Sequence, residues 1–439
     1  MAIPMTAAQL VNVLYSIVDR MYIGHISGVG SVALTGLGLT MPLISIISAF
    51  ANLCGMGGAP LCSIARGRDD IPYAEKIMAN AYTMLLILGA VITAASLIWM
   101  QPILYLFGAS ESTYPYAAAY ARIYLCGTLF VMLSLGMNSF INSQGFSRTG
   151  MYTVLLGAVI NIILDPVFIF VFDMGIAGAA IATIIAQFCS AVWALHFLSG
   201  KKAILRFSVF RLHLDYKIVG RILALGVTGF VMGATTGFVQ ILCNTQLKKY
   251  GGDLYVGAMT VTNSIREVVF MMMNGLTSGS QPVLGYNYGA KAYERVRRGI
   301  KFIIGAGLGY SFVVWGIIML IPGVLVRIFN SEPELVAVSI PAMRTYFAAF
   351  VFMSLQMTGQ SVFVGLGKSR QAIFFSIFRK IILVVPMIIF LPKLSFGAMG
   401  VFMSEPISDV IGGLACCTTM LLTVYFPLKR EEKRLGLIK

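Results

Sequence analysis

The chain has 439 residues, of which 58% are hydrophobic and 11% charged, and its formal net charge is +15. Soluble domains carry about a quarter charged residues, whereas residues 21–65, 77–110 and 174–200 contain no Asp, Glu, Lys or Arg. Apolar runs this long exclude a soluble enzyme, a nucleic-acid-binding domain and a disordered chain. They also differ from the short alternating segments of a transmembrane barrel.

Breaks in hydropathy predict about twelve membrane-spanning helices along the chain. Each is long enough to cross a bilayer, which takes about 20 apolar residues. The predicted spans are 1–23, 33–62, 77–107, 114–143, 150–172, 176–199, 221–247, 255–284, 300–327, 337–364, 371–392 and 396–427.

The basic residues gather on one side of these spans. Even-numbered connections and the C-terminal tail hold 22 of the 32 Lys and Arg residues, while odd-numbered connections hold four. The positive-inside rule then predicts a multi-pass protein of the inner (plasma) membrane with both termini in the cytoplasm. The excess positive charge reflects topology and attraction to anionic lipid headgroups, so no nucleic-acid partner is expected.

An internal repeat divides the chain into two halves of six spans each. With an offset of 222 residues, identical residues recur from Gly30 and Gly252 to Gly178 and Gly400. An even number of spans leaves both halves in the same orientation, which makes the repeat parallel. We therefore expect an all-α membrane protein with a 6+6 arrangement. Its parts would be a lobe at 1–200, a cytoplasmic linker at 201–220, a lobe at 221–428 and a basic cytoplasmic tail at 429–439.

Acidic residues within the spans mark candidate functional sites, because charges at bilayer depth are costly. In the first half, Asp19 lies in the first span. Asn161 and Asp165 are spaced i, i+4 and therefore share one helix face. Pro166 follows and leaves a nearby carbonyl without its helical partner. These oxygens suit either Na⁺ or a proton shared between two carboxylates.

Hydroxyl oxygens could complete this cluster. Thr183 and Tyr120 lie in neighbouring spans, so a Na⁺ site at Asp19, Asn161, Asp165 and Thr183 is one expectation. The alternative is a static ion pair, in which Arg20 or Arg122 neutralises an aspartate.

The second half carries acids and bases together. Glu405 and Asp409 share a face at i, i+4, and Glu267 is a third acid within a span. A charged network of Glu267, Arg379, Glu405 and Asp409 is expected. Structural pairing and a role toward substrate remain equally open, because buried pairs are often neutral in net energy.

Several uncharged residues within the spans are candidates for a substrate cavity. An amide there can contact cargo or hydrogen-bond a neighbouring helix, and methionine lines promiscuous surfaces. These candidates are Asn12, Asn138, Gln240, Met273, Gln356 and Gln360.

Two segments resemble the MATE (multidrug and toxic compound extrusion) family, and specifically its bacterial MepA-like and DinF-like branch. Residues 12–24 read NVLYSIVDRMYIG, similar to the family's first helix, and residues 281–290 read QPVLGYNYGA, similar to the end of its eighth helix. The resemblance covers the whole chain. It implies two six-helix lobes forming a V around a central cavity. It also implies export of organic, often cationic, compounds in exchange for Na⁺ or H⁺, without a cofactor.

The resemblance also assigns residues. Asp19 matches the acid of the first helix, and the polar network of helices five and six is matched by Asn161, Asp165 and Thr183. Tyr120 matches the network's tyrosine, and Asn12 and Asn138 match cavity-facing positions. The acid that some members carry in helix seven is replaced by Gln240 or Asn244, and helix ten offers Gln356 and Gln360 instead of an acid. The coupling site is therefore expected in the first half.

The expected function is that of a monomeric antiporter for small organic molecules, working in the lipid bilayer. A flippase for lipid-linked precursors or another amphiphile is the alternative from the same wider superfamily. A membrane-embedded enzyme is a third reading, since Asp69 and Asp70 resemble half of a motif for magnesium–diphosphate chemistry. The second half of such a motif is missing.

Overall fold

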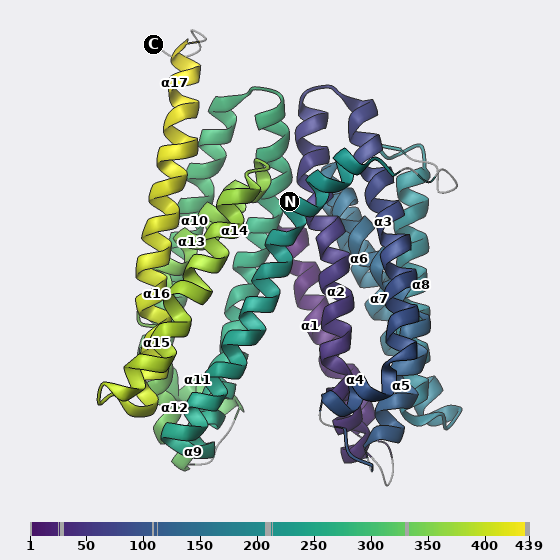
Figure 1. The fold of residues 1–439 in the computed structure, drawn as a ribbon, viewed down its shortest axis with the longest axis vertical. Coiled ribbons are helices and arrows are strands. Elements are labelled where there is room, and N and C mark those ends of the chain that lie inside the picture. The colour runs from purple at the N-terminus through teal and green to yellow at the C-terminus, as the bar shows by residue number, and fades with distance from the viewer. Residues whose placement is uncertain are drawn as a thin grey trace. The chain divides into compact units, whose positions relative to one another are not determined.

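The structure is a computed structural model that describes residues 2–24, 26, 30–107, 109–111, 113–206, 212, 214–329 and 333–434. Within these ranges every regular element is a helix and no strand is present (Figure 1), so the predicted all-α class is confirmed. The chain forms two compact units, Ile3–Phe230 and Val231–Lys439. The boundary between them falls within α9, the longest helix.

The N-terminal unit is built around α2, which packs against α3, α5 and α6, while α8 packs against α5, α6 and α7 (Figure 1). Its large buried side chains include Phe140, Leu85 and Leu125. The elements are α1 (Ala2–Gly24), α2 (Gly30–Gly67), α3 (Ile71–Ile98), α4 (Met100–Leu106), α5 (Tyr114–Cys126), α6 (Thr128–Ser143), α7 (Ser147–Pro166), the π-helix η1 (Val167–Val171), α8 (Gly175–Ser199) and the beginning of α9 (Tyr216–Gly289).

The C-terminal unit is built around α13, which packs against α10 and α16. α9 enters this unit at Val231 and consists of two helical segments separated at Gly252, whose φ of 69° is not helical. The following elements are α10 (Tyr293–Leu320), α11 (Pro322–Phe329), α12 (Pro333–Tyr346), α13 (Phe350–Gly365), α14 (Ser369–Ile377), η2 (Phe378–Val384), α15 (Val385–Phe390), η3 (Leu391–Lys393), α16 (Gly397–Met420), η4 (Leu421–Tyr425) and α17 (Phe426–Arg434).

The helices are long and apolar enough to span a membrane. Among the described residues, nine helices meet this criterion, and eleven if each bent pair is one span. The bent pairs are α5 with α6, at 57°, and α12 with α13, at 50°. The part of α9 after Gly252 lies outside that set and contains Arg266 and Glu267. It is helical as far as Gly289 and lies where the eighth span is predicted.

The repeat is visible in the backbone as well as in the sequence. Positive φ angles recur at the same offset of 222 residues, at 59° for Asp69 and 55° for Lys291. The glycines that begin α8 and α16 also match, with φ of 53° at Gly175 and 52° at Gly397. Because side chains disfavour this region, such angles mark turns of specific geometry. The two halves therefore fold by the same local rules.

The segment predicted as a linker is bonded to the N-terminal unit at both of its described ends. The buried Gln144 accepts hydrogen bonds from the backbone N–H groups of Ile204 and Leu205, both at 2.8 Å. Farther along, the N–H of Asp215 donates to Asn80 Oδ1 at 2.6 Å, and α9 begins at Tyr216. Residues 207–211 and 213 lie outside the described residues.

Candidate functional site

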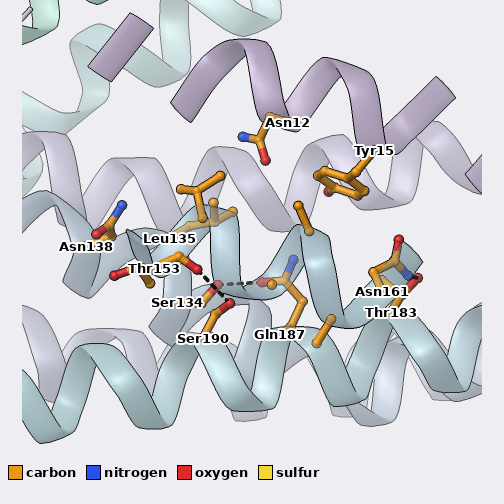
Figure 2. A pocket seen from close by; sticks show the side chains of 14 residues that line it. Asn12, Tyr15, Ser134, Leu135, Asn138, Thr153, Asn161, Thr183, Gln187 and Ser190 are labelled. Atoms are coloured by element: carbon orange, nitrogen blue, oxygen red, sulfur yellow. Dashed lines mark hydrogen bonds between the residues drawn. The ribbon is translucent and has the colours of Figure 1, made fainter. Parts of the chain in front are cut away.

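A small polar cavity lies inside the N-terminal unit, between α1, α6, α7 and α8. Figure 2 shows Asn161 and Thr183 toward one end and Asn138 toward the other, with Asn12 and Tyr15 of α1 facing them. The cavity volume is about 40 Å³, enough for an ion or a few water molecules but far below the 300 Å³ or more of a drug-sized pocket. Its polar lining residues are Asn12, Tyr15, Ser134, Asn138, Thr153, Asn161, Thr183, Gln187 and Ser190.

The carboxylate of Asp165 is held by Asn161, a cavity-lining residue of the same helix that also contacts α8. Asn161 Nδ2 donates to Asp165 Oδ1 at 3.0 Å and contacts Thr183 Oγ1 at 3.4 Å. The Thr183 hydroxyl donates to Ala179 O at 2.9 Å, which turns its lone pairs toward Asn161. Asp165 is fully buried and Asn161 is 2% exposed. The i, i+4 spacing predicted from the sequence thus brings amide and carboxylate together.

The other predicted oxygen donors surround the same carboxylate. Asp19 of α1 lies close to Asp165. Tyr120 of α5 pairs with Thr183 and lies near Asp19, and its ring stacks on Tyr124 with centroids 5.9 Å apart. All five residues proposed for ion coupling therefore converge in one unit.

Two buried oxygens of this group receive no hydrogen bond from any residue that the structure describes. They are Asp165 Oδ2 and Asn161 Oδ1. A buried acceptor without a donor costs about 1–3 kcal/mol, and more when it is charged. Together with the second carboxylate at Asp19, these oxygens form a site that is stabilised by adding a proton or a small cation.

The alternative of a static ion pair is not seen at Asp165. No described basic side chain forms an ion pair with it, and Arg122 is exposed. The side chain of Arg20 lies outside the described residues. Among the described residues there is also no group of three or more His, Cys, Asp or Glu side chains suited to a metal ion. The candidate ligands for an ion are therefore the carboxylates of Asp19 and Asp165 together with the uncharged oxygens near them.

Sequence reasoning missed several residues of the cavity. Tyr15 lies beside Asp19 and Asp165, and the Ser134 hydroxyl donates to Gln187 Oε1 at 2.5 Å. Ser190 Oγ donates to Thr153 O at 3.1 Å. The sequence marks these residues only as polar residues within apolar spans. Serine and tyrosine occur in many of the spans, so this criterion does not identify the ones that line the cavity.

The charged residues of the C-terminal unit form a closed cluster. Arg379 Nη1 contacts Asp409 Oδ1 at 2.5 Å and Glu405 Oε1 at 3.1 Å, and Lys380 Nζ contacts the same Glu405 oxygen at 3.0 Å. All four are buried. Glu267, predicted as a member, is instead exposed and outside these ion pairs. Lys380, which was not predicted as a member, belongs to the network.

The remaining cavity candidates lie in helix–helix contacts. Gln240 accepts from Asn263 at 3.1 Å and donates to Asn244 at 3.2 Å. Gln360 donates to Ser376 Oγ at 2.6 Å. Gln356 donates to Phe375 O at 3.4 Å, while its Oε1 has no donor among the described residues. Met273 is 2% exposed within the packed interior.

The acidic pair considered for enzyme chemistry has a structural role. Asp70 Oδ1 accepts from the N–H of Tyr73 at 3.1 Å and caps the start of α3. Such a cap typically contributes about 1 kcal/mol.

Comparisons with known proteins agree with this architecture. The sequence profile of the MatE family matches residues 4–167 and 229–390. A multidrug export protein MepA of Staphylococcus haemolyticus is 24% identical over 431 residues, covering 98% of this chain and 93% of that protein. The MepA of Staphylococcus aureus strain MW2 is also 24% identical, covering 97% and 92%.

Solved structures show the same fold. The MATE multidrug transporter DinF-BH, solved in complex with a ligand, superposes with a TM-score of 0.87 at 30% identity, covering 96% of this chain and 94% of that one. A MATE protein in a bent conformation gives a TM-score of 0.92 at 23% identity, covering 99% and 96%. With both halves matched by the profile, the expected family is confirmed, and with it a membrane transport role rather than an enzymatic one: the chain belongs to the MATE family of multidrug efflux transporters.

Proposed function

We propose that this chain is an antiporter that exports organic, mainly cationic, compounds in exchange for Na⁺ or H⁺. The observation that carries the proposal is the buried Asp165 carboxylate, which has an oxygen without a donor and a second acid, Asp19, beside it. Acidic residues within membrane spans typically mark ion and substrate pathways. The relatives named as multidrug exporters support the class of cargo.

Coupling would act through the occupancy of this site. With the site empty, two carboxylates face one another in a low-dielectric interior and repel. A bound proton or Na⁺ removes that repulsion and satisfies the oxygens of Asp165 and Asn161. Since Asp19 lies on α1 and Asp165 on α7, occupancy changes the free energy of bringing α1 against α7. An ion gradient then shifts the balance between two conformations, and a difference of a few kcal/mol is sufficient.

The cargo would bind elsewhere than in this cavity, because about 40 Å³ cannot hold an organic dye. Asn12 and Asn138, expected to face cargo, line the ion-sized cavity instead.

We propose that both termini face the cytoplasm, as the distribution of Lys and Arg indicates, and that the protein works as a monomer.

The direct test is dye transport in proteoliposomes under an imposed Na⁺ gradient and, separately, an imposed pH gradient. Wild-type protein should move an organic cation dye under at least one of them. Asp165→Asn should lose that transport while remaining folded, since the amide keeps the shape but carries no charge. Asp173→Asn is the matched control, because Asp173 is exposed and Asn tolerates its φ of 53°. Ion-driven transport by Asp165→Asn at the control's rate would refute the proposal.

A further inference from the structure

The internal register relates the cavity of the N-terminal unit to the charged cluster of the C-terminal unit. Adding 222 to the number of a cavity residue gives its counterpart in the second half. Four counterparts of cavity residues are the four members of the charged cluster. The pairs are Gly157 with Arg379, Ala158 with Lys380, Thr183 with Glu405, and Gln187 with Asp409.

A hydrogen bond found in both units shows that this register is structural. Asn138 Nδ2 donates to the carbonyl of Gly150 at 3.3 Å. Their counterparts repeat the contact, since Gln360 Nε2 donates to the carbonyl of Ala372 at 3.2 Å. Each bond joins the same two helices of its unit, α6 to α7 and α13 to α14. The residues that follow along α7 and along α14 with η2 therefore occupy equivalent places.

The equivalent places carry small residues in one unit and long basic residues in the other. Gly157 and Ala158 line the cavity, and even a methyl group on Gly157 would come within 2.5 Å of Ser190 Oγ. Their counterparts are the two longest basic side chains. Arg379 and Lys380 reach Glu405 at 3.1 and 3.0 Å from the positions where the N-terminal unit has Gly157 and Ala158.

The charges in the C-terminal cluster are consistent with this difference. Lys380 is 9% exposed, Glu405 6% and Asp409 2%. Removing such charges from water is expensive, and removing one partner alone leaves an uncompensated buried ion. Arg266 lies near Glu405 and Arg379 but forms none of the ion pairs of this cluster among the described residues. The acids therefore face cations that belong to the chain, whereas Asp165 faces none among the described residues.

We propose that Arg379 and Lys380 are cations tethered to the chain that fill the C-terminal counterpart of the N-terminal ion site. This inference rests on the proposed function and deepens it, because it places the exchangeable ion in the N-terminal unit and not at the equivalent position of the C-terminal unit. The Lys380 ammonium group permanently provides the positive charge that a proton or Na⁺ provides transiently near Asp165. The C-terminal unit keeps the arrangement of polar residues but does not exchange an ion with the surrounding solution.

Removing the tethered ammonium should restore a cation site. The test uses full-length Asp165→Asn protein in detergent, with and without Lys380→Ala, the residue found at the counterpart Ala158. Melting temperature is measured against Na⁺ and against methylammonium, with choline as a bulky control. The Lys380→Ala protein should be stabilised saturably by Na⁺ or methylammonium and not by choline, because a ligand stabilises the state that binds it. Asp165→Asn alone should not respond.

A second variant separates charge from packing. Lys380→Ala with Glu405→Thr, which copies the N-terminal pair of Ala158 and Thr183, should fold and show no cation response. If Lys380→Ala alone fails to fold and the double change folds, the charge of Lys380 is what the site needs, as proposed. A folded Lys380→Ala protein without a cation response, or loss of folding in both proteins, would overturn the inference. Neither result depends on whether Asp165→Asn still transports, so the proposed function is tested separately.

Discussion

At the scale of single residues, the candidate site follows from two sequence rules. Polar residues spaced i, i+4 share a helix face, which brings Asn161 to within 3.0 Å of Asp165. Acids within apolar spans stand out because they are rare and costly. Neither rule reveals which residues of distant helices meet. Tyr15 and Gln187 complete the cavity through contacts between helices, and their identities carry no signal of it.

Asn161 tests how the carboxylate is held. Asn161→Ala removes the hydrogen bond to Asp165 and one of the two acceptors that lack a donor. A hydrogen bond to a charged group contributes about 1.5–3 kcal/mol. Because the lost bond stabilises the ion-free carboxylate, the affinity for a proton should rise about tenfold to a hundredfold, whereas loss of the Asn161 oxygen should lower the affinity for Na⁺. The measurement is the ion concentration that gives half-maximal dye transport. Asn138→Ala, at the other end of the cavity, should change it far less, and equal effects would contradict the assigned geometry.

At the scale of elements, hydropathy predicts where helices run but not how they bend. The span predicted at 114–143 is two helices meeting at 57°, and that at 337–364 is two meeting at 50°. The spans predicted at 221–247 and 255–284 correspond to the two helical segments of α9, which are separated at the non-helical Gly252 and contact each other where Asn263 donates to Gln240. Hydropathy reports how favourably a segment transfers into lipid, whereas the continuity of a helix depends on its backbone dihedral angles. Pro166 is followed by a π-helical turn, a common adjustment at functional sites.

Close packing of α8 against η1 depends on Gly178. A Cβ there would lie 2.7 Å from the backbone carbonyl carbon of Phe168, and the counterpart Gly400 meets Leu391 in the same way. Because backbone cannot move aside easily, Gly178→Ala should destabilise the protein by about 1–3 kcal/mol. Thermal unfolding in detergent measures this. Gly220→Ala, with nothing within 4 Å of its Cβ, should be neutral or slightly stabilising, and a loss equal to that of Gly178→Ala would contradict the packing argument.

The linker offers a test of local stability. Gln144→Ala removes the acceptor for the buried N–H of Leu205. An unsatisfied buried donor costs about 1–3 kcal/mol, so exchange of this amide with deuterium should become about tenfold faster or more. Hydrogen exchange with mass spectrometry follows residues 203–206 directly. Gln101→Ala on the exposed side of α4 is the control, and unchanged exchange in Gln144→Ala would show that the linker is fixed by other contacts.

At the scale of the whole molecule, the repeat is the feature that the sequence predicts best. An offset read from identical residues recurs in the positive φ angles of both units and in the bonds of Asn138 and Gln360. The functional asymmetry between the halves is not predictable in the same way. Arg379 and Lys380 lie beside acids on another helix, and only the packed structure shows that these charges are paired within the unit.

The central claim is that an ion in the N-terminal unit opposes binding of the cargo. Coupling between two ligands is reciprocal, so the most direct measurement is the affinity of purified protein for an organic cation dye, with and without the coupling ion. In wild-type protein the ion should weaken dye binding about fivefold or more, as couplings of 1–3 kcal/mol do. In Asp165→Asn the dye affinity should not depend on the ion. An affinity that is independent of Na⁺ and pH in wild-type protein would contradict the account.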